Sequence, residues 1–341
     1  MKPWQNSSTP GFLNKRQIHL ALILAPLILL IAIFISLSIG TSGVGFFKAL
    51  RDLFSANRES ADFRIIFYVR LPRTLGAVFA GAALALSGTV IQAVLDNPLA
   101  APNVIGVGSG AAFSVICCMA LFPAFIYLLP LAAFLGALLS ALLIYAISAL
   151  TDAGRVTVTL VGVAVGSILT ALTNTVKVIF PDSIYDVTSF LIGSLSASSG
   201  VRVYPALLLI IPTALICVIL CPRLDALSLG SAVAGTLGIS VKRERLLFLT
   251  AAAILAGAAV SYAGLVGFVG LIVPNLIRRI FGGSHKYLCP LSIFFGGAFL
   301  TLCDTLSRVI FSPYELPVGI ILSLIGGPFF ITLLLKRRVH V

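Results

Sequence analysis

Long apolar runs, separated by short polar segments, follow one another along the whole chain. Many of them approach the ~20 residues that a helix needs to cross the hydrocarbon core of a bilayer. Lipid offers the backbone no hydrogen-bond partners, so an uninterrupted apolar run of this length must be helical. A membrane β-barrel would show short alternating segments instead, and the sequence has none. The pattern therefore predicts an all-α polytopic membrane protein.

We expect about ten transmembrane helices in a single transmembrane domain spanning residues 1–341. They cover residues 20–40, 71–93, 101–121, 126–150, 157–178, 203–221, 246–263, 265–281, 288–309 and 317–335. The run Leu20–Ile39 is longer than the apolar region of a signal peptide, so it is interpreted as a retained first helix. The eighth helix is the least regular, because glycines crowd its start and Pro274 interrupts it. The connections 41–70 and 179–202 are too long for simple turns.

The polar segment 222–245 has a helical pattern of its own. Its apolar positions recur at helical spacing and are broken by glycines: Leu227, Ala234, Leu237 and Val241 against Gly230, Gly235 and Gly238. The pattern predicts two short helices on the inner surface. A short amphipathic element of this kind is a natural docking surface for a partner protein. The alternative is a segment that lies on the membrane surface.

Composition and charge agree with this picture. Hydrophobic residues make up 59% of the chain and charged residues only 10%, whereas about 25% is usual in soluble proteins. The net charge of +12 resides in short clusters between apolar runs, which is typical of topology signals rather than of nucleic-acid binding. With ten crossings and an inner N-terminus, more than half of the lysines and arginines fall in inner segments. We therefore expect both termini in the cytoplasm.

The sequence contains no recognisable catalytic machinery. It has no phosphate-binding loop, no nucleophile elbow and no carboxylate pair, and its three histidines are scattered. We predict no catalytic residue, no metal site and no cofactor. Cys217 and Cys221 have an i, i+4 spacing that could hold a metal, but small apolar packing residues are the expected role. The helix interiors are nearly free of the charges that ion-coupled carriers use, which indicates that another subunit supplies the energy.

Arg70-Leu71-Pro72-Arg73 opens the second helix on its outer side, against the charge rule for membrane loops. Pro72 suits the first helical turn, but arginines at a helix N-terminus are unfavourable for the helix dipole. On the outer surface, Arg70 and Arg73 could bind carboxylates of an external protein in bidentate pairs. Snorkelling to the membrane interface is the alternative.

Three further motifs contain polar residues near helix ends. Gln92, in the second helix, and the turn Asn97-Pro98 could line a pore, although for Gln92 taken alone a hydrogen bond to another helix is the favoured role. Asp304 and Arg308 stand at i, i+4 and can pair. Glu315, just before Pro317, suits the dipole of the next helix. The glycines of the second helix, and the GxxxG motif of residues 162–166, allow close helix contacts within the chain or between two chains.

In this order and spacing, the motifs resemble those of the FecCD-type permeases, which import iron-siderophore chelates, haem and cobalamin. The resemblance covers nearly the whole chain. It rests on residues 70–73, on Gln92 with 97–100, on 227–230 with 237–238, on 267–271 with Pro274, and on 304–308, 315–319 and 327–330.

The resemblance implies the type II ABC importer permease fold, with ten helices per subunit and a dimer, homo- or heteromeric, around a central pathway. It implies partners: two cytoplasmic ATP-binding subunits and an extracytoplasmic substrate-binding protein. Arginines at the positions of Arg70, Arg73 and Arg308 meet acidic residues of that binding protein in the family. The stretch Leu227-Ser228-Leu229-Gly230, with Leu237-Gly238, corresponds to the helices that contact the ATPase. The expected location is the bacterial inner membrane.

This chain departs from the family pattern at Asp96, at Asn275, where histidine is common, and at Cys289. None of these positions belongs to the docking arginines or the coupling segment, so the departures bear on the substrate. We expect an iron-siderophore-type chelate, with haem or cobalamin as the alternatives. A secondary transporter is a competing hypothesis, and it would call for charges at mid-membrane.

Overall fold

The computed structural model describes residues 15–40, 60–150, 155–181 and 183–338, and every regular element in these ranges is a helix. The elements are α1 (Lys15–Ser38), α3 (Ala61–Arg64), η1 (Ile65–Arg70), α4 (Leu71–Val94), η2 (Pro102–Ile105), α5 (Val107–Leu121), η3 (Ile126–Leu128), α6 (Leu129–Leu150), α7 (Arg155–Ile179), α8 (Ser183–Ile192), α9 (Gly200–Ile219), α10 (Cys221–Ser228), α11 (Ser231–Thr236), α12 (Val241–Ala263), α13 (Val269–Phe281), α14 (His285–Val309) and α15 (Val318–Arg338). The polar segment before residue 15 and most of the predicted 41–70 connection lie outside the described residues.

Each predicted transmembrane helix has a helical counterpart. Seven helical stretches are long and apolar enough to cross a membrane, and two shorter apolar helices cover 107–121 and 318–333. The remaining counterpart, α13, has 13 residues. At 1.5 Å per residue it reaches only about 20 Å, less than the hydrocarbon core. The non-helical residues 264–268 that precede it account for the irregular start predicted there.

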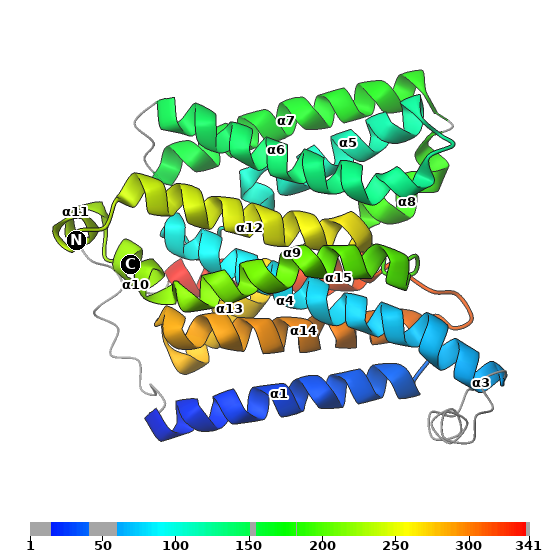
Figure 1. The fold of residues 1–341 in the computed structure, drawn as a ribbon, viewed down its shortest axis with the longest axis horizontal. Coiled ribbons are helices and arrows are strands. Elements are labelled where there is room, and N and C mark those ends of the chain that lie inside the picture. The colour runs from blue at the N-terminus through cyan, green and yellow to red at the C-terminus, as the bar shows by residue number, and fades with distance from the viewer. Residues whose placement is uncertain (1–14, 41–59, 151–154, 182, 339–341) are drawn as a thin grey trace.

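The long helices run roughly side by side along the long axis of the molecule (Figure 1). α4 and α12 lie in the middle of the bundle, while α1 and α7 lie at opposite edges. The short helices α10 and α11 are at one end, and α3 is at the other. α1 begins and α15 ends at the α10–α11 end, as an even number of crossings requires.

Small residues let α4 occupy the centre of the bundle. Almost every side chain of α4 is buried, and the helix is rich in glycine and alanine. A Cβ atom at Gly81 would overlap the backbone of Gly296 in α14, and one at Gly88 would overlap the backbone of Gly270 in α13. Backbones therefore touch at these crossings, which is how membrane helices gain van der Waals contact in the absence of a hydrophobic driving force.

The GxxxG motif of α7 serves packing within the chain. A Cβ atom at Gly162 would overlap the carbonyl oxygen of Val104 in η2, and one at Gly166 would touch Ser109 in α5. Of the two roles that the sequence left open for this motif, the structure supports intramolecular packing.

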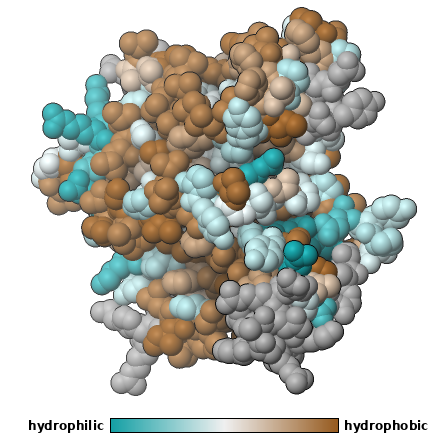
Figure 2. All heavy atoms as spheres, turned by 45° about the vertical axis from the view of Figure 1, so that its right-hand side comes forward, coloured by the Kyte–Doolittle hydropathy of each residue, from teal (hydrophilic) through white to brown (hydrophobic). Residues whose placement is uncertain are grey.

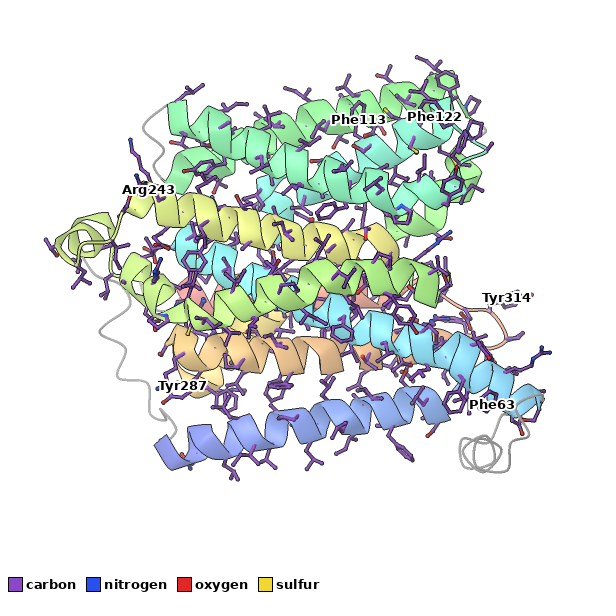
Figure 3. All side chains as sticks on the ribbon, viewed as in Figure 1. Phe63, Phe113, Phe122, Arg243, Tyr287 and Tyr314 are labelled. Carbon is purple, nitrogen blue, oxygen red and sulfur yellow. The ribbon has the colours of Figure 1, made fainter. Side chains whose placement is uncertain are left out.

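The outer faces of the bundle are apolar. Exposed leucine, isoleucine and valine side chains cover α1, α6, α7 and α9, and hydrophobic atoms cover much of the face visible in Figure 2. Arg243 and Tyr287 lie at the α10–α11 end, and Phe63, Phe122 and Tyr314 lie at the other end (Figure 3). Aromatic residues at both ends are typical of the two membrane–water interfaces.

Two predicted helices are shorter than expected, because a backbone break interrupts each. The run 101–121 is a short 3-10 turn followed by α5, with Gly106 at φ 74° between them. The run 265–281 becomes helical only after Phe268, which has φ 66°. The predicted connection 179–202 contains a helix of its own, α8. Hydropathy along the sequence does not reveal such breaks, because the residues before and after each break are equally hydrophobic.

Candidate functional sites

A cluster of buried charges lies at the α3 end of the bundle, and Arg73 is at its centre. The guanidinium of Arg73 donates to both carboxylate oxygens of Asp304 at 3.0–3.2 Å, and its Nη1 donates to Glu315 at 2.7 Å. The side chain of Asp304 is 1% exposed and that of Glu315 is 35% exposed. The cluster therefore joins α4, α14 and the 310–317 loop through one guanidinium group. Glu315 serves here as an ion-pair partner rather than only as a helix-end charge.

Arg308 also belongs to the charge cluster and lies one turn after Asp304 on α14. Its Nε lies 3.3 Å from Asp304, which confirms the predicted i, i+4 pair. Its Nη2 donates to the hydroxyl of Ser36 in α1 at 2.7 Å and to Thr305 at 3.1 Å. Ser36 also shares a 2.8 Å hydrogen bond with Thr74. These contacts attach α1 to the α4–α14 pair.

Arg70 binds the other side of the α1 terminus. It is the last residue of η1, a π-helical turn that lies within the continuous helix 61–94. Its Nη1 donates to the carbonyl of Leu37 at 2.8 Å and to that of Ser38 at 3.4 Å. These carbonyls end α1 and have no partner within the helix, so a cation satisfies them well.

The three arginines of the predicted docking set are buried among partners from their own chain, which the sequence analysis did not predict. Arg70, Arg73 and Arg308 are 4%, 7% and 3% exposed. The physical reason is that a guanidinium within an apolar bundle is costly without partners, and free carbonyls and carboxylates of the same chain lie within reach. An external carboxylate would have to compete with these internal partners.

Gln92, Asn97 and Pro98 hold the end of α4 against α13. Gln92 is 2% exposed and donates from Nε2 to Gly270 at 3.2 Å. Asn97 accepts from the backbone N–H of Leu99 at 3.0 Å, which fixes the turn. The carbonyl of Pro98 accepts from Nδ2 of Asn275 at 2.8 Å. The structure thus brings these predicted gate residues together with Asn275, which also donates to the carbonyl of Leu271 within its own helix.

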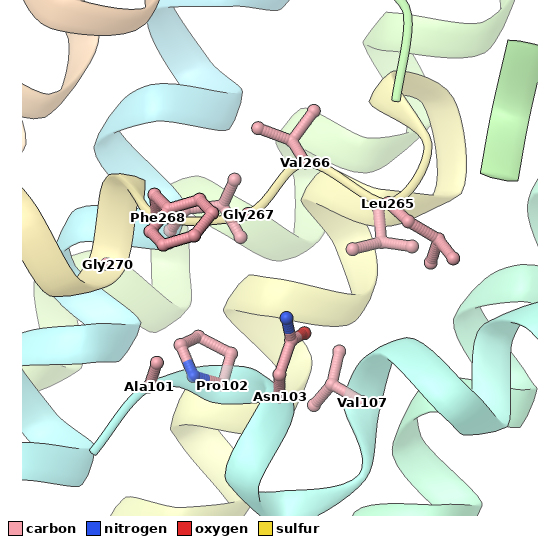
Figure 4. Close-up of a pocket in the computed structure, with 11 residues that line it drawn as sticks. Ala101, Pro102, Asn103, Val107, Leu265, Val266, Gly267, Phe268 and Gly270 are labelled. Atoms are coloured by element: carbon pink, nitrogen blue, oxygen red, sulfur yellow. The ribbon is translucent and has the colours of Figure 1, made fainter. Parts of the chain in front are cut away.

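A small cavity lies where the two helix breaks face each other. It is bounded by Pro102, Asn103 and Val107 on one side and by residues 265–268 on the other (Figure 4). Its volume of about 20 Å³ suits a single water molecule. Binding sites for drug-sized ligands measure about 300–1,000 Å³. This cavity is therefore not a site for a bulky chelate.

One face of α7 is polar and exposed, although α7 is long and apolar enough to cross a membrane. Ser167, Thr170 and Asn174 are spaced three or four residues apart and are all exposed. The two hydroxyl groups donate to carbonyls four residues earlier, at 2.9 and 2.8 Å. The amide of Asn174 has no hydrogen bond within the described part of the chain. The two hydroxyl groups are satisfied within the helix, so it is the Asn174 amide that favours water or a second chain beside this face. The sequence signal was the polar i, i+3/4 periodicity inside an apolar helix, which our sequence analysis did not use.

The segment 222–245 contains the two short helices that its pattern predicts, α10 and α11. Leu224 and Leu227 of α10 are buried in the bundle, whereas Leu229, Val233 and Leu237 are 52%, 43% and 60% exposed. Gly230, between Leu229 and Val233, and Gly238, after Leu237, have φ values of 104° and 75°, which suit glycine at the sharp turns there. The segment is therefore anchored on one side and presents apolar side chains on the other.

Asp225 of α10 makes a further contact that the sequence analysis missed. Its Oδ1 accepts from both the backbone N–H and the Nδ1 of His285, at 2.9 and 2.7 Å. Burial of Asp225 works to raise its pKa, but the hydrogen bonds from His285 outweigh this and lower the pKa from its usual value. The carboxylate is therefore held in its charged form. The two residues are far apart in sequence, so no spacing pattern could have paired them.

Comparisons with known proteins agree with the geometry. The model of the FecCD transport family matches residues 28–336. The hemin transport system permease HmuU of Yersinia pestis is 34% identical over 320 residues, covering 91% of this chain and 95% of the relative. The Fe(3+)-citrate import system permease YfmE of Bacillus subtilis is 35% identical over 318 residues, with 91% and 95% covered.

A third relative and a solved structure extend the comparison. The cobalamin import system permease BtuC of Halobacterium salinarum is 39% identical over 279 residues, covering 81% of this chain and 74% of the relative. A metal-chelate type ABC transporter, solved in an inward-facing conformation, superposes with a TM-score of 0.80 at 30% identity. That alignment covers 92% of this chain and 98% of the other.

Proposed function

Because this chain belongs to the FecCD transport family, as the permease of an ABC importer for iron chelates, haem or cobalamin, we propose that it carries an iron-siderophore-type chelate into the cytoplasm, driven by ATP hydrolysis in partner subunits. It is a transport subunit of the bacterial inner membrane and not itself an ATPase. The observation that carries the proposal is the family match over 28–336 in a chain without a phosphate-binding loop of its own.

The polar face of α7 supports a pathway at the boundary between two permease subunits. Ser167, Thr170 and Asn174 face away from their own bundle. A water-filled route between two copies, or between this chain and a related one, would solvate them without any contact with lipid. A wide route of this kind also fits a bulky substrate that the small internal cavity cannot hold.

The α3 end of the bundle is the proposed docking side for an extracytoplasmic binding protein. Arg70, Arg73 and Arg308 outnumber Asp304 and Glu315 there, so the cluster keeps an excess of positive charge. An acidic partner would be attracted to it over a range set by the ionic strength. On docking, the arginines would then exchange their partners within this chain for carboxylates of the binding protein.

Replacing Arg70 by glutamine should weaken docking of the binding protein. Glutamine removes the charge but keeps a polar side chain with hydrogen-bond donors. We expect about a tenfold rise in the Kd and a shallower dependence on salt, as for the loss of one charged contact. The matched control is Arg64→Gln, an exposed arginine on the same helix. Equal binding by both variants over a range of salt concentrations would argue against this docking site.

The α10–α11 end is the proposed contact for the ATP-binding subunits. The exposed Leu229, Val233 and Leu237 form an apolar surface among polar neighbours, which is typical of a helix that docks into a groove. Basic residues gather at the same end, including Arg223, Lys242 and Arg243. This distribution supports the proposal that the α10–α11 end, with both chain termini, is cytoplasmic.

The decisive test is ATP-dependent uptake by the reconstituted importer. The permease, its ATP-binding subunits and its binding protein are placed in vesicles and offered ferric siderophores, ferric citrate, hemin and cobalamin. We expect uptake of a ferric siderophore that stops without ATP or without the binding protein. Uptake of hemin or cobalamin alone would replace the proposed substrate but keep the mechanism. Uptake by the permease alone, independent of ATP, would favour a secondary transporter.

A further inference from the structure

Helix α14 connects the two ends of the bundle to which the partners are assigned. It begins at His285, beside α10, and ends at Val309, beside the buried charge cluster. Its outer end carries Asp304 and Arg308, which bind Arg73 of α4 and Ser36 of α1. In between, it packs tightly along α4, with Gly296 against Gly81. This helix therefore makes continuous packing contact between the two ends, as the transmission of a displacement between them would require.

The inner end of α14 depends on a residue from another helix. Its own N-cap residue, Ser284, makes no capping hydrogen bond with its side chain. Asp225 of α10 supplies the missing acceptor to the backbone N–H of His285, and a carboxylate is favoured at the positive end of a helix dipole. Pro290 lacks the N–H that would bond back to the first turn, so this turn relies further on the external cap.

The side chain of His285 reinforces the same contact. It is 4% exposed, and its Nδ1 lies 2.7 Å from Asp225. Its Nε2 is buried and has no hydrogen-bond partner in the described part of the chain. A buried, half-satisfied imidazole is less favourable than an apolar side chain of the same size would be. Among the described residues, the bond to Asp225 is the one polar contact of this ring, and an apolar side chain could not make it.

We propose that Asp225 and His285 are positioning residues that transmit movement of the short helix α10 to α14, and through α14 to the charge cluster at the opposite end. The proposal rests on the assignment of α10–α11 to the ATP-binding subunits. In this arrangement Leu224 and Leu227 seat α10 in the bundle. The Asp225–His285 pair then fixes α10 to one particular helix, so that a push on the exposed leucines moves α14.

The test measures the amount of substrate carried per ATP hydrolysed, in addition to each activity by itself. In vesicles with the complete importer, ATP hydrolysis and substrate uptake are measured together for Asp225→Ala and His285→Ala, with the compound that the wild type takes up from the panel. We expect both variants to assemble and hydrolyse ATP while the substrate carried per ATP falls about 5- to 150-fold, the usual range for coupling between two sites. His285→Asn keeps a donor near the position of Nδ1 and should recover most of the ratio. Lys286→Ala removes an exposed charge from the neighbouring residue and should behave as wild type.

Several outcomes would overturn the inference. One is an unchanged ratio in Asp225→Ala and His285→Ala. Another is a parallel fall of hydrolysis and uptake, which would make the contact merely structural. Should the alanine variants fail to assemble, His285→Leu, which fills the buried site but has no donor to Asp225, decides in the same way. If the wild-type importer shows no ATP-dependent uptake, the proposed function itself fails, whereas an active wild type with equally coupled variants refutes only the role of this pair.

Discussion

Replacing Asp304 by asparagine should destabilise the protein by about 3–5 kcal/mol, the usual consequence of breaking a buried ion pair by removing one partner. Asp304 is fully buried and accepts from Arg73 while it pairs with Arg308. Asparagine has nearly the same shape, so packing is preserved and only the charge is lost. Two guanidinium groups would then remain in the bundle with Glu315 as their nearest carboxylate, and α4 and α14 would lose the ion pair that joins them.

Thermal unfolding of the purified protein in detergent provides the measurement. The matched control is Glu315→Gln, which removes the other carboxylate that binds Arg73. Glu315 is about one third exposed, so water can compensate for the lost pair, and we expect a cost of about 1 kcal/mol or less. Equal shifts of the unfolding midpoint in the two variants would mean that burial of a carboxylate does not determine how much its ion pairs stabilise the protein.

Replacing Gly88 by alanine should prevent α4 and α13 from packing as they do. The added methyl group would overlap the backbone of Gly270, and backbone atoms cannot move aside as a flexible side chain can. Overpacking typically costs about 1–3 kcal/mol and occasionally more, and we expect the upper part of this range. The displacement would also break the hydrogen bond from Gln92 to Gly270, which lies one turn further along α4.

The matched control for Gly88→Ala is Gly166→Ala, inside α7. A Cβ built at Gly166 would have only the hydroxyl oxygen of Ser109 nearby, at 3.6 Å, which is an ordinary van der Waals distance, so the same substitution is accommodated there. Because alanine favours a helix over glycine by about 1 kcal/mol, this control should be neutral or slightly stabilising. The yield of folded, monodisperse protein and the unfolding midpoint distinguish the two. A Gly88→Ala variant as stable as the control would show that α4 and α13 can move apart without loss of stability.

Both predictions concern contacts between residues that are distant in sequence, and these are what the sequence could not supply. It predicted that Asp304 and Arg308 pair, because an i, i+4 spacing fixes their distance on a helix. It could not pair Arg73 with Asp304 and Glu315, or Asp225 with His285, since these distances depend on how whole helices pack. The burial of Arg70 could not be predicted for the same reason. Its neighbours, the terminal carbonyls of α1, come from another helix.

By itself, the sequence determined the class of the protein and the helical course of the chain. A bilayer accepts only long apolar helices of this kind, so hydropathy alone locates them. The order of the motifs also indicated the family, which the full-length comparison then established. Hydropathy did not reveal the breaks at Gly106 and Phe268, because residues on both sides are equally apolar. Only the tertiary structure decided where the buried charges find partners, which face of α7 is left exposed, and that α14 joins the two ends of the molecule. Those features follow from backbone contacts at the glycine crossings, where the positions of whole helices are set.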